Sequence, residues 1–167
     1  FFASAITGVV NAVYNQANMV LVVLDNSTTA MTGHQPHPGT GRTVMGEIVQ
    51  KINIEQVLRG IGVTEIETIN PLELEASVSC VKRMAEKSGV RAIIFKAPCI
   101  AVTKPKAPLH VDQDSCIGCK KCIRDLGCPA IVMNDGKICI DASMCTGCHL
   151  CSQVCPVCAI AGGDDHE

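Results

Sequence analysis

The stretch that decides the fold is residues 116–129, Cys116-Ile-Gly-Cys-Lys-Lys-Cys-Ile-Arg-Asp-Leu-Gly-Cys-Pro129. Its pattern returns at residues 145–156 as Cys145-Thr-Gly-Cys-His-Leu-Cys-Ser-Gln-Val-Cys-Pro156, so that the first cysteines of the two runs are 29 residues apart. Three thiolates separated by two residues each let a tight loop bind three corners of an iron–sulfur cube. The duplicated run therefore predicts two 4Fe-4S clusters.

Each run supplies only three closely spaced cysteines, so a fourth ligand must come from elsewhere. In a two-cluster arrangement this ligand is the Cys-Pro cysteine of the other run. We assign the first cluster to Cys116, Cys119, Cys122 and Cys155. We assign the second cluster to Cys145, Cys148, Cys151 and Cys128.

Two other uses of the cysteines compete with this interpretation. A zinc ribbon would take four cysteines tetrahedrally and leave the third cysteine of each run and both Cys-Pro cysteines unused. Disulfides between cysteines three positions apart would close strained short loops. Of the remaining cysteines, we expect Cys139 and Cys158 to be small buried hydrophobic residues, and Cys80 and Cys99 to be structural.

Residues 109–163 resemble the bacterial-type two-cluster ferredoxins, which implies a small α+β domain. The first run departs from that pattern, because five residues rather than three precede its Cys-Pro, and we expect the two extra residues to lengthen a loop around 124–127. Asn134-Asp135-Gly136 predicts a turn between short strands at 130–133 and 137–140.

The first hundred residues predict alternating helices and strands. An apolar stripe over 2–17 predicts a helix, and the continuous apolar run 19–24 predicts a strand that is buried on both faces. Asn53 is placed to cap a short helix at 54–59, and strands are expected at 65–69 and 90–96. Between these strands, the segment 70–73 predicts a helix N-terminus, and the buried face of that helix is expected to contain Leu74, Val78, Val81 and Ala85. This order implies a doubly wound parallel α/β sheet.

A polar loop rich in Gly and Pro follows the strand at 19–24. Ligands of such sheets bind at the carboxyl ends of the strands. Asn26 and the carbonyls near Thr28 are oxygen ligands of the kind that Mg²⁺ takes. From sequence chemistry alone, a surface loop with an Asx turn is the favoured interpretation.

The stretch from Phe1 to Gly41 resembles the thiamine diphosphate site of 2-oxoacid:ferredoxin oxidoreductases. Within that family, the whole chain is similar to the C-terminal part of the α subunit of the branch that acts on indolepyruvate. The resemblance implies that Asp25-Asn26 is the second half of the cofactor signature, with the Asn26 side chain and the Thr28 carbonyl completing a Mg²⁺ shell. It also implies that Met31, Thr32, Gly33 and His34 lie near the cofactor, and that His37 is a further candidate for substrate or cofactor contact.

The same resemblance implies an activity and a set of partners. It implies oxidative decarboxylation of an arylpyruvate to an acyl-CoA, with single electrons passing through the clusters to an external ferredoxin. A related enzyme for pyruvate or a branched-chain 2-oxoacid, and a non-catalytic two-cluster electron-transfer protein, are the alternatives. The Gly-Asp half of the signature is absent, since the chain begins at Phe1. We therefore expect the remaining N-terminal part of the subunit and a second subunit to complete the enzyme, and the chain alone to be inactive.

The composition excludes some classes of partner. Only four aromatic residues and a net charge of −2 argue against nucleic-acid binding, and no apolar run is long enough to span a bilayer. Oxygen-labile clusters lead us to expect the cytoplasm of an anaerobe. The expected domains are residues 1–97, the C-terminal portion of a thiamine diphosphate-binding domain, and 109–167, a two-cluster ferredoxin domain, joined by a linker rich in Pro and Lys at 98–108.

Overall fold

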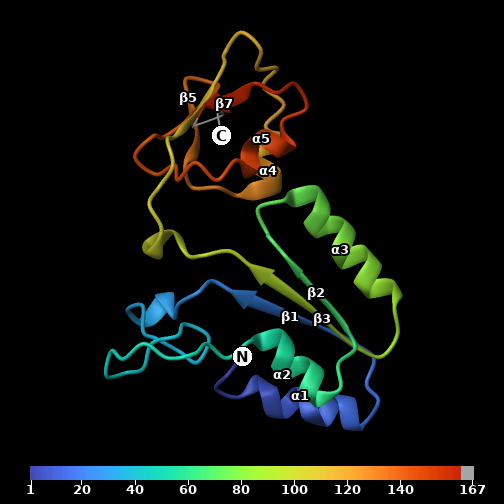
Figure 1. Cartoon of the computed structure of the whole chain (residues 1–167). Helices are drawn as coiled ribbons and strands as arrows, with labels where there is room; N and C mark the ends of the chain where they lie inside the picture. The colour runs from blue at the N-terminus through green and yellow to red at the C-terminus, as the bar shows by residue number, and fades with distance from the viewer. Residues whose placement is uncertain (163–167) are drawn as a thin grey trace. The chain divides into compact units, whose positions relative to one another are not determined.

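The computed structural model describes residues 1–162 and divides into two compact units, Phe1–Thr103 and Lys104–Glu167 (Figure 1). The first unit contains, in chain order, α1 (Ala5–Tyr14), β1 (Met19–Asp25), η1 (Ala30–Thr32), α2 (Ile54–Ile61), β2 (Glu65–Ile69), α3 (Leu74–Glu86), β3 (Val90–Lys96) and η2 (Ile100–Val102). The second contains β4 (Leu109–Val111), α4 (Lys121–Leu126), β5 (Ile131–Asn134), β6 (Lys137–Ile140), α5 (Leu150–Val154) and β7 (Ile160–Gly162).

The first unit is a parallel sheet with helices on both faces. Its strands follow the order β1-β3-β2, and both outer strands pair in parallel with β3. Ala92 and Ile94 of β3 pack in one core with residues of α1 and α2, whereas Ile93 packs in a second core with Cys80 and Met84 of α3. Alternate residues of β3 therefore face different helices, and the predicted doubly wound α/β fold is confirmed (Figure 1).

The prediction that the strand at 19–24 is buried on both faces is wrong. Within β1 only Val23 is buried, and Leu24 is 76% exposed. The four consecutive buried residues lie instead in β3, from Arg91 to Ile94. Since β3 is the middle strand of the three and β1 is an edge strand, the pairing order, and not the apolar run, decides which strand is enclosed.

The helix after β2 was predicted one turn too early and with the wrong buried face. The Asn70 side chain accepts a hydrogen bond from the Leu72 N–H at 3.0 Å, which closes a turn, and α3 begins only at Leu74. Its buried residues are Ser77, Cys80 and Met84, while Val78 and Val81 are each 44% exposed. The Ser77 hydroxyl donates to the Asn70 carbonyl at 3.2 Å, so the turn holds the helix with this face toward the sheet.

Other local predictions are confirmed. The strands at 65–69 and 90–96 have the expected bounds. The Asn53 side chain accepts a hydrogen bond from the Gln56 N–H at 3.1 Å and caps α2, which ends at a left-handed Gly62. In the second unit, β5 and β6 form an antiparallel hairpin whose turn residues Asp135 and Gly136 both have positive φ, as the Asn-Asp-Gly sequence predicts.

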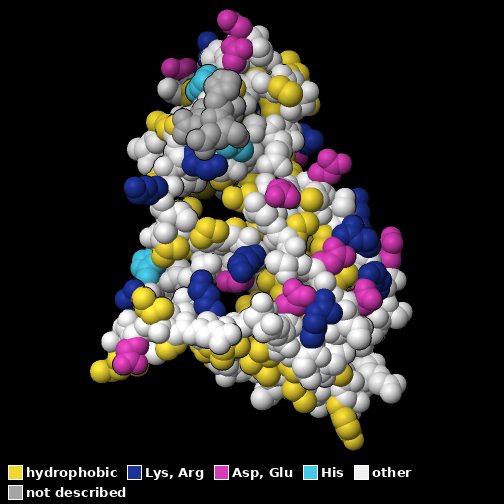
Figure 2. Space-filling view, in the orientation of Figure 1, with side chains coloured by type: hydrophobic (Ala, Val, Ile, Leu, Met, Phe, Trp, Pro, Cys, Tyr) yellow, Lys and Arg dark blue, Asp and Glu magenta, His cyan; other side chains and the backbone are white. Residues whose placement is uncertain are grey.

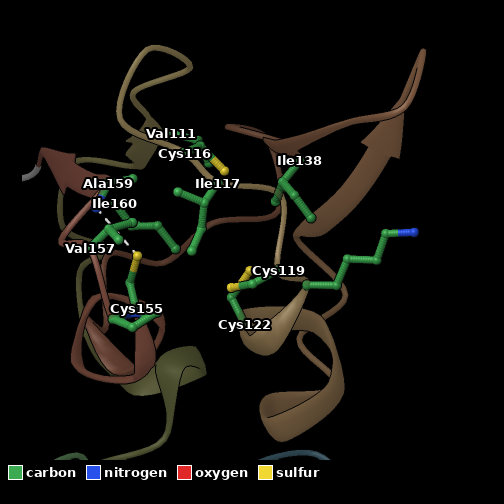
Figure 3. Close-up of a pocket in the computed structure, with 12 residues that line it drawn as sticks. Val111, Cys116, Ile117, Cys119, Cys122, Ile138, Cys155, Val157, Ala159 and Ile160 are labelled. Carbon is green, nitrogen blue, oxygen red and sulfur yellow. Dashed lines mark hydrogen bonds between the residues drawn. The ribbon is translucent and has the colours of Figure 1, made fainter.

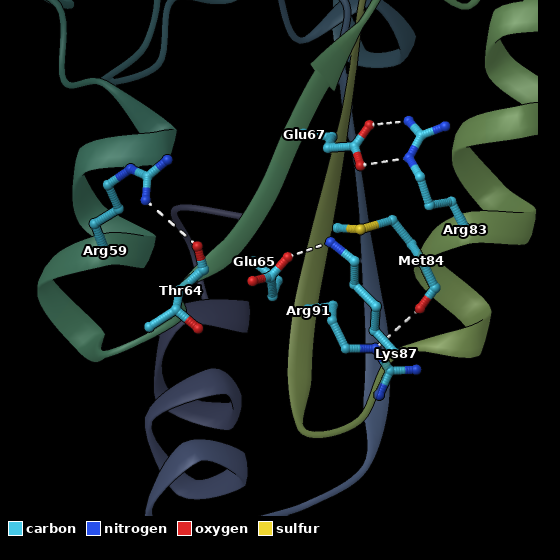
Figure 4. Close-up of polar contacts among 8 residues, drawn as sticks. All are labelled: Arg59, Thr64, Glu65, Glu67, Arg83, Met84, Lys87 and Arg91. Carbon is cyan, nitrogen blue, oxygen red and sulfur yellow. Dashed lines mark hydrogen bonds and ion pairs between the residues drawn. The ribbon is translucent and has the colours of Figure 1, made fainter.

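The buried guanidinium of Arg91 caps the C-terminal end of α3. Arg91 is 4% exposed, and its Nε donates to the Met84 carbonyl at 3.0 Å (Figure 4). Its Nη1 donates to the Asn18 side chain. The last four carbonyls of a helix have no partner within the helix, so the Arg91 guanidinium satisfies one of them and places its charge near the negative end of the helix.

We expect Arg91→Met to destabilise the first unit by about 2 kcal/mol, because the Met84 carbonyl and the Asn18 amide would lose their partner in a buried place. The measurement is the midpoint of urea unfolding followed by circular dichroism. Lys82→Met on the exposed surface of α3 is the control, with an expected change of less than about 0.5 kcal/mol. Equal stability of the Arg91 variant and the native chain would contradict the capping role.

Two ion pairs connect the exposed side of α3 to β2, Arg83 with Glu67 and Lys87 with Glu65 (Figure 4). The Arg83 guanidinium lowers the pKa of the Glu67 carboxyl below its ordinary value of 4.5. A lowered carboxyl pKa stabilises the fold at neutral pH, and this contribution is lost as the pH falls below about 4.5. Both side chains are partly exposed, so the contribution is small.

The surface of the first unit is uneven. Figure 2 shows Lys and Arg side chains interspersed with Asp and Glu over α3, and hydrophobic side chains at the tip of the long loop that follows β1. The most exposed large hydrophobic residues of this loop are Met31, Val44, Met45 and Ile48, each at least 85% exposed. No helix within residues 1–162 is long and apolar enough to cross a membrane.

Candidate cluster and cofactor sites

The two cysteine runs fold into the same loop. Gly118 and Gly147 occupy the same position of the repeat and have φ of +65° and +67°. Lys120 and His149 also correspond, with φ of +61° and +60°, and each stands directly before its helix, α4 or α5. The duplication seen in the sequence is therefore present in the backbone.

Each of the two loops begins at an aspartate, Asp112 or Asp141, whose role was not predicted from the sequence. The Asp112 carbonyl accepts from the Cys116 N–H, and the Asp141 carbonyl accepts from the Cys145 N–H, each at 3.0 Å. The Asp141 side chain accepts a hydrogen bond from the Ser143 N–H at 2.9 Å, and its hydrogen bonds with Ser143 lower the pKa of the Asp141 carboxyl. In the same way, the hydrogen bond from the Ser115 hydroxyl lowers the pKa of the Asp112 carboxyl. The sequence does carry a signal for this role, because the two aspartates are 29 residues apart, the same spacing as the first cysteines of the two runs.

The four cysteines assigned to the first cluster surround one cavity. Cys116, Cys119 and Cys122 come from the first run, and Cys155 comes from the second. Their sulfurs point into a common space in Figure 3. Apolar residues form the rest of the wall, among them Val111, Ile117, Ile138, Val157, Ala159 and Ile160.

The four cysteines assigned to the second cluster also lie near one another. Burial, together with the neighbouring thiolates of Cys148, Cys145 and Cys128, raises the pKa of the Cys151 thiol to about 11. Likewise, burial raises the pKa of the Cys122 thiol, with contributions from Cys119 and Cys155. In both groups, the third cysteine of one run is within electrostatic range of the Cys-Pro cysteine of the other run.

Backbone N–H groups point at two of these sulfurs. The Leu109 N–H donates to the Cys145 sulfur at 3.4 Å, and the Ala159 N–H donates to the Cys155 sulfur at 3.3 Å (Figure 3 shows the second bond). Donors of this kind stabilise added negative charge on a thiolate-bound centre and raise its reduction potential.

The donor set fits iron–sulfur clusters better than the alternatives. All twelve cysteines are free thiols, so the structure contains no disulfide framework. Among residues 1–162, no three His, Cys, Asp or Glu side chains converge closely enough to hold a single metal ion. A mononuclear zinc site needs all its sulfurs about 2.3 Å from one point, whereas a cubane core keeps its four thiolates farther apart around a shared cavity.

The four cysteines outside the two groups differ in how deeply they are buried. Cys80 is fully buried in α3, and Cys99 is half-buried. Cys139, which the sequence predicts to be buried, is only half-buried. The prediction that Cys158 is buried is wrong, because this residue is exposed and has a φ of +52°.

The two extra residues of the first run extend a helix rather than a loop. α4 continues to Leu126 and ends at left-handed Gly127, so the expectation of a longer loop is wrong. Two extra residues, Val157 and Cys158, follow the Cys-Pro of the second run. They restore the 29-residue spacing at Ala130 and Ala159, whose carbonyls accept from Asp141 and Asp112 at 2.8 Å.

A second cavity lies in the first unit at the carboxyl end of β1. It has a volume of about 440 Å³, in the range usual for cofactor sites. Asp25, Asn26, Thr28 and Met31, which the resemblance places near a cofactor, line it, and their contact with that cofactor stays a prediction. Phe1, Phe2, Thr29, Ala30 and His37 line it as well.

Local hydrogen bonds fix the backbone on the floor of this cavity. The Asn26 side chain accepts from the Thr28 N–H at 3.2 Å, and Thr28 is 7% exposed. The Cys99 N–H donates to the Asn26 carbonyl at 2.9 Å, which joins the segment after β3 to the end of β1. An Asx turn is therefore present, and both of its residues, Asn26 and Thr28, line the cavity and carry oxygen donors of the kind that suits Mg²⁺.

The predicted loop residues divide into two groups. Thr32, Gly33 and His34 are exposed and are not among the residues that line this cavity, so their contact with a cofactor stays a prediction. His37 does line it and is half-buried, with its Nδ1 accepting from the Gly39 N–H at 3.1 Å and its ring 5.8 Å from that of Phe2. The sequence does not distinguish His34 from His37, because their different positions depend on how the loop folds.

Comparisons with known proteins identify two families in this chain. Residues 1–95 match the family described as thiamine pyrophosphate enzyme, C-terminal TPP binding domain, and residues 109–156 match the 4Fe-4S dicluster domain. No solved structure matches the chain.

Curated relatives are named indolepyruvate oxidoreductase subunit IorA. The chain is 44% identical over 162 residues to the subunit of Methanothermobacter thermautotrophicus, and 39% identical over 166 residues to that of Archaeoglobus fulgidus. Each alignment includes 96% of this chain. The chain spans only 26% and 27%, respectively, of the length of these relatives.

Proposed function

The chain belongs to the family of thiamine pyrophosphate enzymes, through their C-terminal TPP-binding domain, and from this premise we propose that it is part of a 2-oxoacid:ferredoxin oxidoreductase acting on indolepyruvate or a related arylpyruvate. The observation that carries the proposal is the presence, in one chain, of a cavity at the end of β1 and of four cysteines around a second cavity. Relatives named for indolepyruvate favour this substrate over pyruvate or branched-chain acids.

When bound, thiamine diphosphate supplies the electron sink that lets a 2-oxoacid lose CO₂, and iron–sulfur clusters take up the released electrons one at a time. In our proposal, the Asn26 side-chain oxygen and the Thr28 carbonyl hold the Mg²⁺ that accompanies the diphosphate. His37 packs against Phe2 and narrows the cavity beside them. The apolar wall around Cys116 and Cys155 shields that side of the assigned cluster from water.

The proposed assembly is larger than this chain. Coenzyme A as acyl acceptor, an external ferredoxin as electron acceptor, and the remaining part of the subunit together with a second subunit are its proposed partners. We also propose a cytoplasmic location, since clusters of this kind are sensitive to oxygen. The chain alone is not expected to oxidise 2-oxoacids.

The test is calorimetric titration of thiamine diphosphate into the complete anaerobic enzyme, with and without Mg²⁺, followed by an assay with indolepyruvate and with pyruvate. We expect Asn26→Ala to weaken Mg²⁺-dependent binding by about tenfold or more, because one of the two ligands proposed within this chain is lost. Asn15→Ala, at the exposed end of α1, is the matched control and should bind normally. Mg²⁺-independent binding, or equal binding by the two variants, would leave the cofactor site without support.

A further inference from the structure

The two cluster loops have the same backbone but different surfaces. In the first loop Cys119 is exposed and Ile117 is 64% exposed, whereas Cys148 and Thr146 at the corresponding positions are half-buried. Solvent therefore reaches a cysteine assigned to the first cluster more readily than its counterpart assigned to the second.

Charge divides between the two loops in the same way. The first loop and its helix carry the exposed cations Lys120, Lys121 and Arg124, which outnumber the one acid of α4, Asp125. None of the ion pairs found within residues 1–162 includes these three cations. No Lys or Arg occurs anywhere between Ile138 and Gly162, so the second loop has no such charge.

We propose that the face formed by Ile117, Cys119, Lys120, Lys121 and Arg124 is the docking surface for an acidic one-electron carrier protein of the ferredoxin class. This inference rests on the proposed function and names the place at which electrons leave. Protein pairs that exchange electrons make small, transient contacts that opposite charges steer into position. The exposed Cys119 offers a short route from the assigned cluster to the partner.

The exchange is balanced in electrons. One electron leaves the reduced cluster held by Cys116, Cys119, Cys122 and Cys155, and one electron enters the oxidised centre of the partner. No bond forms or breaks, and no proton is transferred. The apolar, exposed Ile117 excludes water at the contact, while the three exposed cations of the same loop and helix attract carboxylates.

The experiment follows transfer from the reduced, cluster-loaded chain to an oxidised, strongly acidic bacterial-type ferredoxin by stopped flow at several salt concentrations. Calorimetry measures the affinity of the same pair. The test variant is Lys120→Gln/Lys121→Gln/Arg124→Gln. The matched control is Lys82→Gln/Lys104→Gln/Lys137→Gln, which changes the net charge equally at exposed cations outside this face.

The proposal predicts that the test variant lowers the second-order rate constant by about tenfold or more, weakens binding and abolishes most of the salt dependence. Iron content and the rate with a small neutral acceptor should not change. The control triple variant should behave like the native chain. Lys121→Glu, which places an acid at the first residue of α4 where a helix tolerates it, should slow transfer further and provides a second variant if the triple substitution impairs folding.

The docking surface would be overturned if the triple test variant and Lys121→Glu both transferred electrons as fast as the native chain. It would also be overturned if the test and control triple variants slowed the transfer equally. If the same triple substitution in the complete enzyme raised the KM for coenzyme A and left transfer to ferredoxin unchanged, the face would be assigned to a nucleotide and the docking surface would be overturned as well. Failure of the native chain to reduce even the neutral acceptor would instead overturn the proposed function.

Discussion

Replacing Gly147 with alanine is expected to remove one iron–sulfur cluster and to leave the other in place. A Cβ atom at this position would lie 2.6 Å from the Ala107 carbonyl oxygen and 2.7 Å from the Lys106 Cβ. Both distances are too short for real contacts, and the first neighbour is backbone. The segment 106–109 would therefore have to move away from the second cluster loop.

Such a movement would reach the ligands directly. The Lys106 N–H donates to the Thr146 carbonyl at 3.2 Å, and the Leu109 N–H donates to the Cys145 sulfur at 3.4 Å. Loss of these bonds displaces Cys145 from the three other thiols assigned to the second cluster. We expect iron and acid-labile sulfide to fall from about eight to about four per chain.

The repeat provides a matched control for this substitution. Gly118 has nearly the same φ, +65°, but nothing lies within 4 Å of a Cβ placed there. Gly118→Ala should cost only the left-handed strain of about 1–2 kcal/mol and keep both clusters. If both variants retain eight irons, or both lose the same number, the close approach at Gly147 does not determine cluster binding.

The cluster loops could be predicted in detail because each is determined by residues close together in the sequence and because the same pattern occurs twice. Cysteine spacing restricts the ligands, and the order Gly-Cys-Lys or Gly-Cys-His places a glycine where φ must be positive. The exchange of Cys128 and Cys155 between halves followed from the requirement for a fourth ligand. The compensating insertion at Val157 and Cys158 was missed, because it is visible only when the spacing of Ala130 and Ala159 is compared as well.

The helices and strands of the α/β unit could be predicted from the sequence, but the residues that are buried in it could not. Capping by Asn53 and the bounds of β2 and β3 depend on residues near in sequence. Which strand is central depends on pairing across the sheet, and the apolar run in β1 carries no information about that order. The buried face of α3 depends on the turn at Asn70, whose bond to Ser77 outweighs the greater hydrophobicity of Val78 and Val81.

The exchange of ligands between the two halves gives the most decisive prediction, since it determines which pairs of cysteines can be removed together. We expect Cys116→Ala/Cys155→Ala to lose one cluster and keep the other, with about four irons remaining. We expect Cys116→Ala/Cys128→Ala to damage both clusters, although it removes the same number of thiols. The measurement is iron and sulfide analysis with EPR spectroscopy of the reduced chain.

The physical reason is the position of Cys155 on the wall of the cavity that contains Cys116, Cys119 and Cys122. Cys128 lies instead near Cys145, Cys148 and Cys151, as its effect on the Cys151 thiol indicates. If each half held its own cluster, the outcomes would be reversed, and the Cys116/Cys128 double variant would be the one that keeps four irons. Cys80→Ala, which removes a buried thiol in the other unit, is the control and should keep about eight irons, because this residue packs against Met84 and Ile93 and not against any assigned ligand.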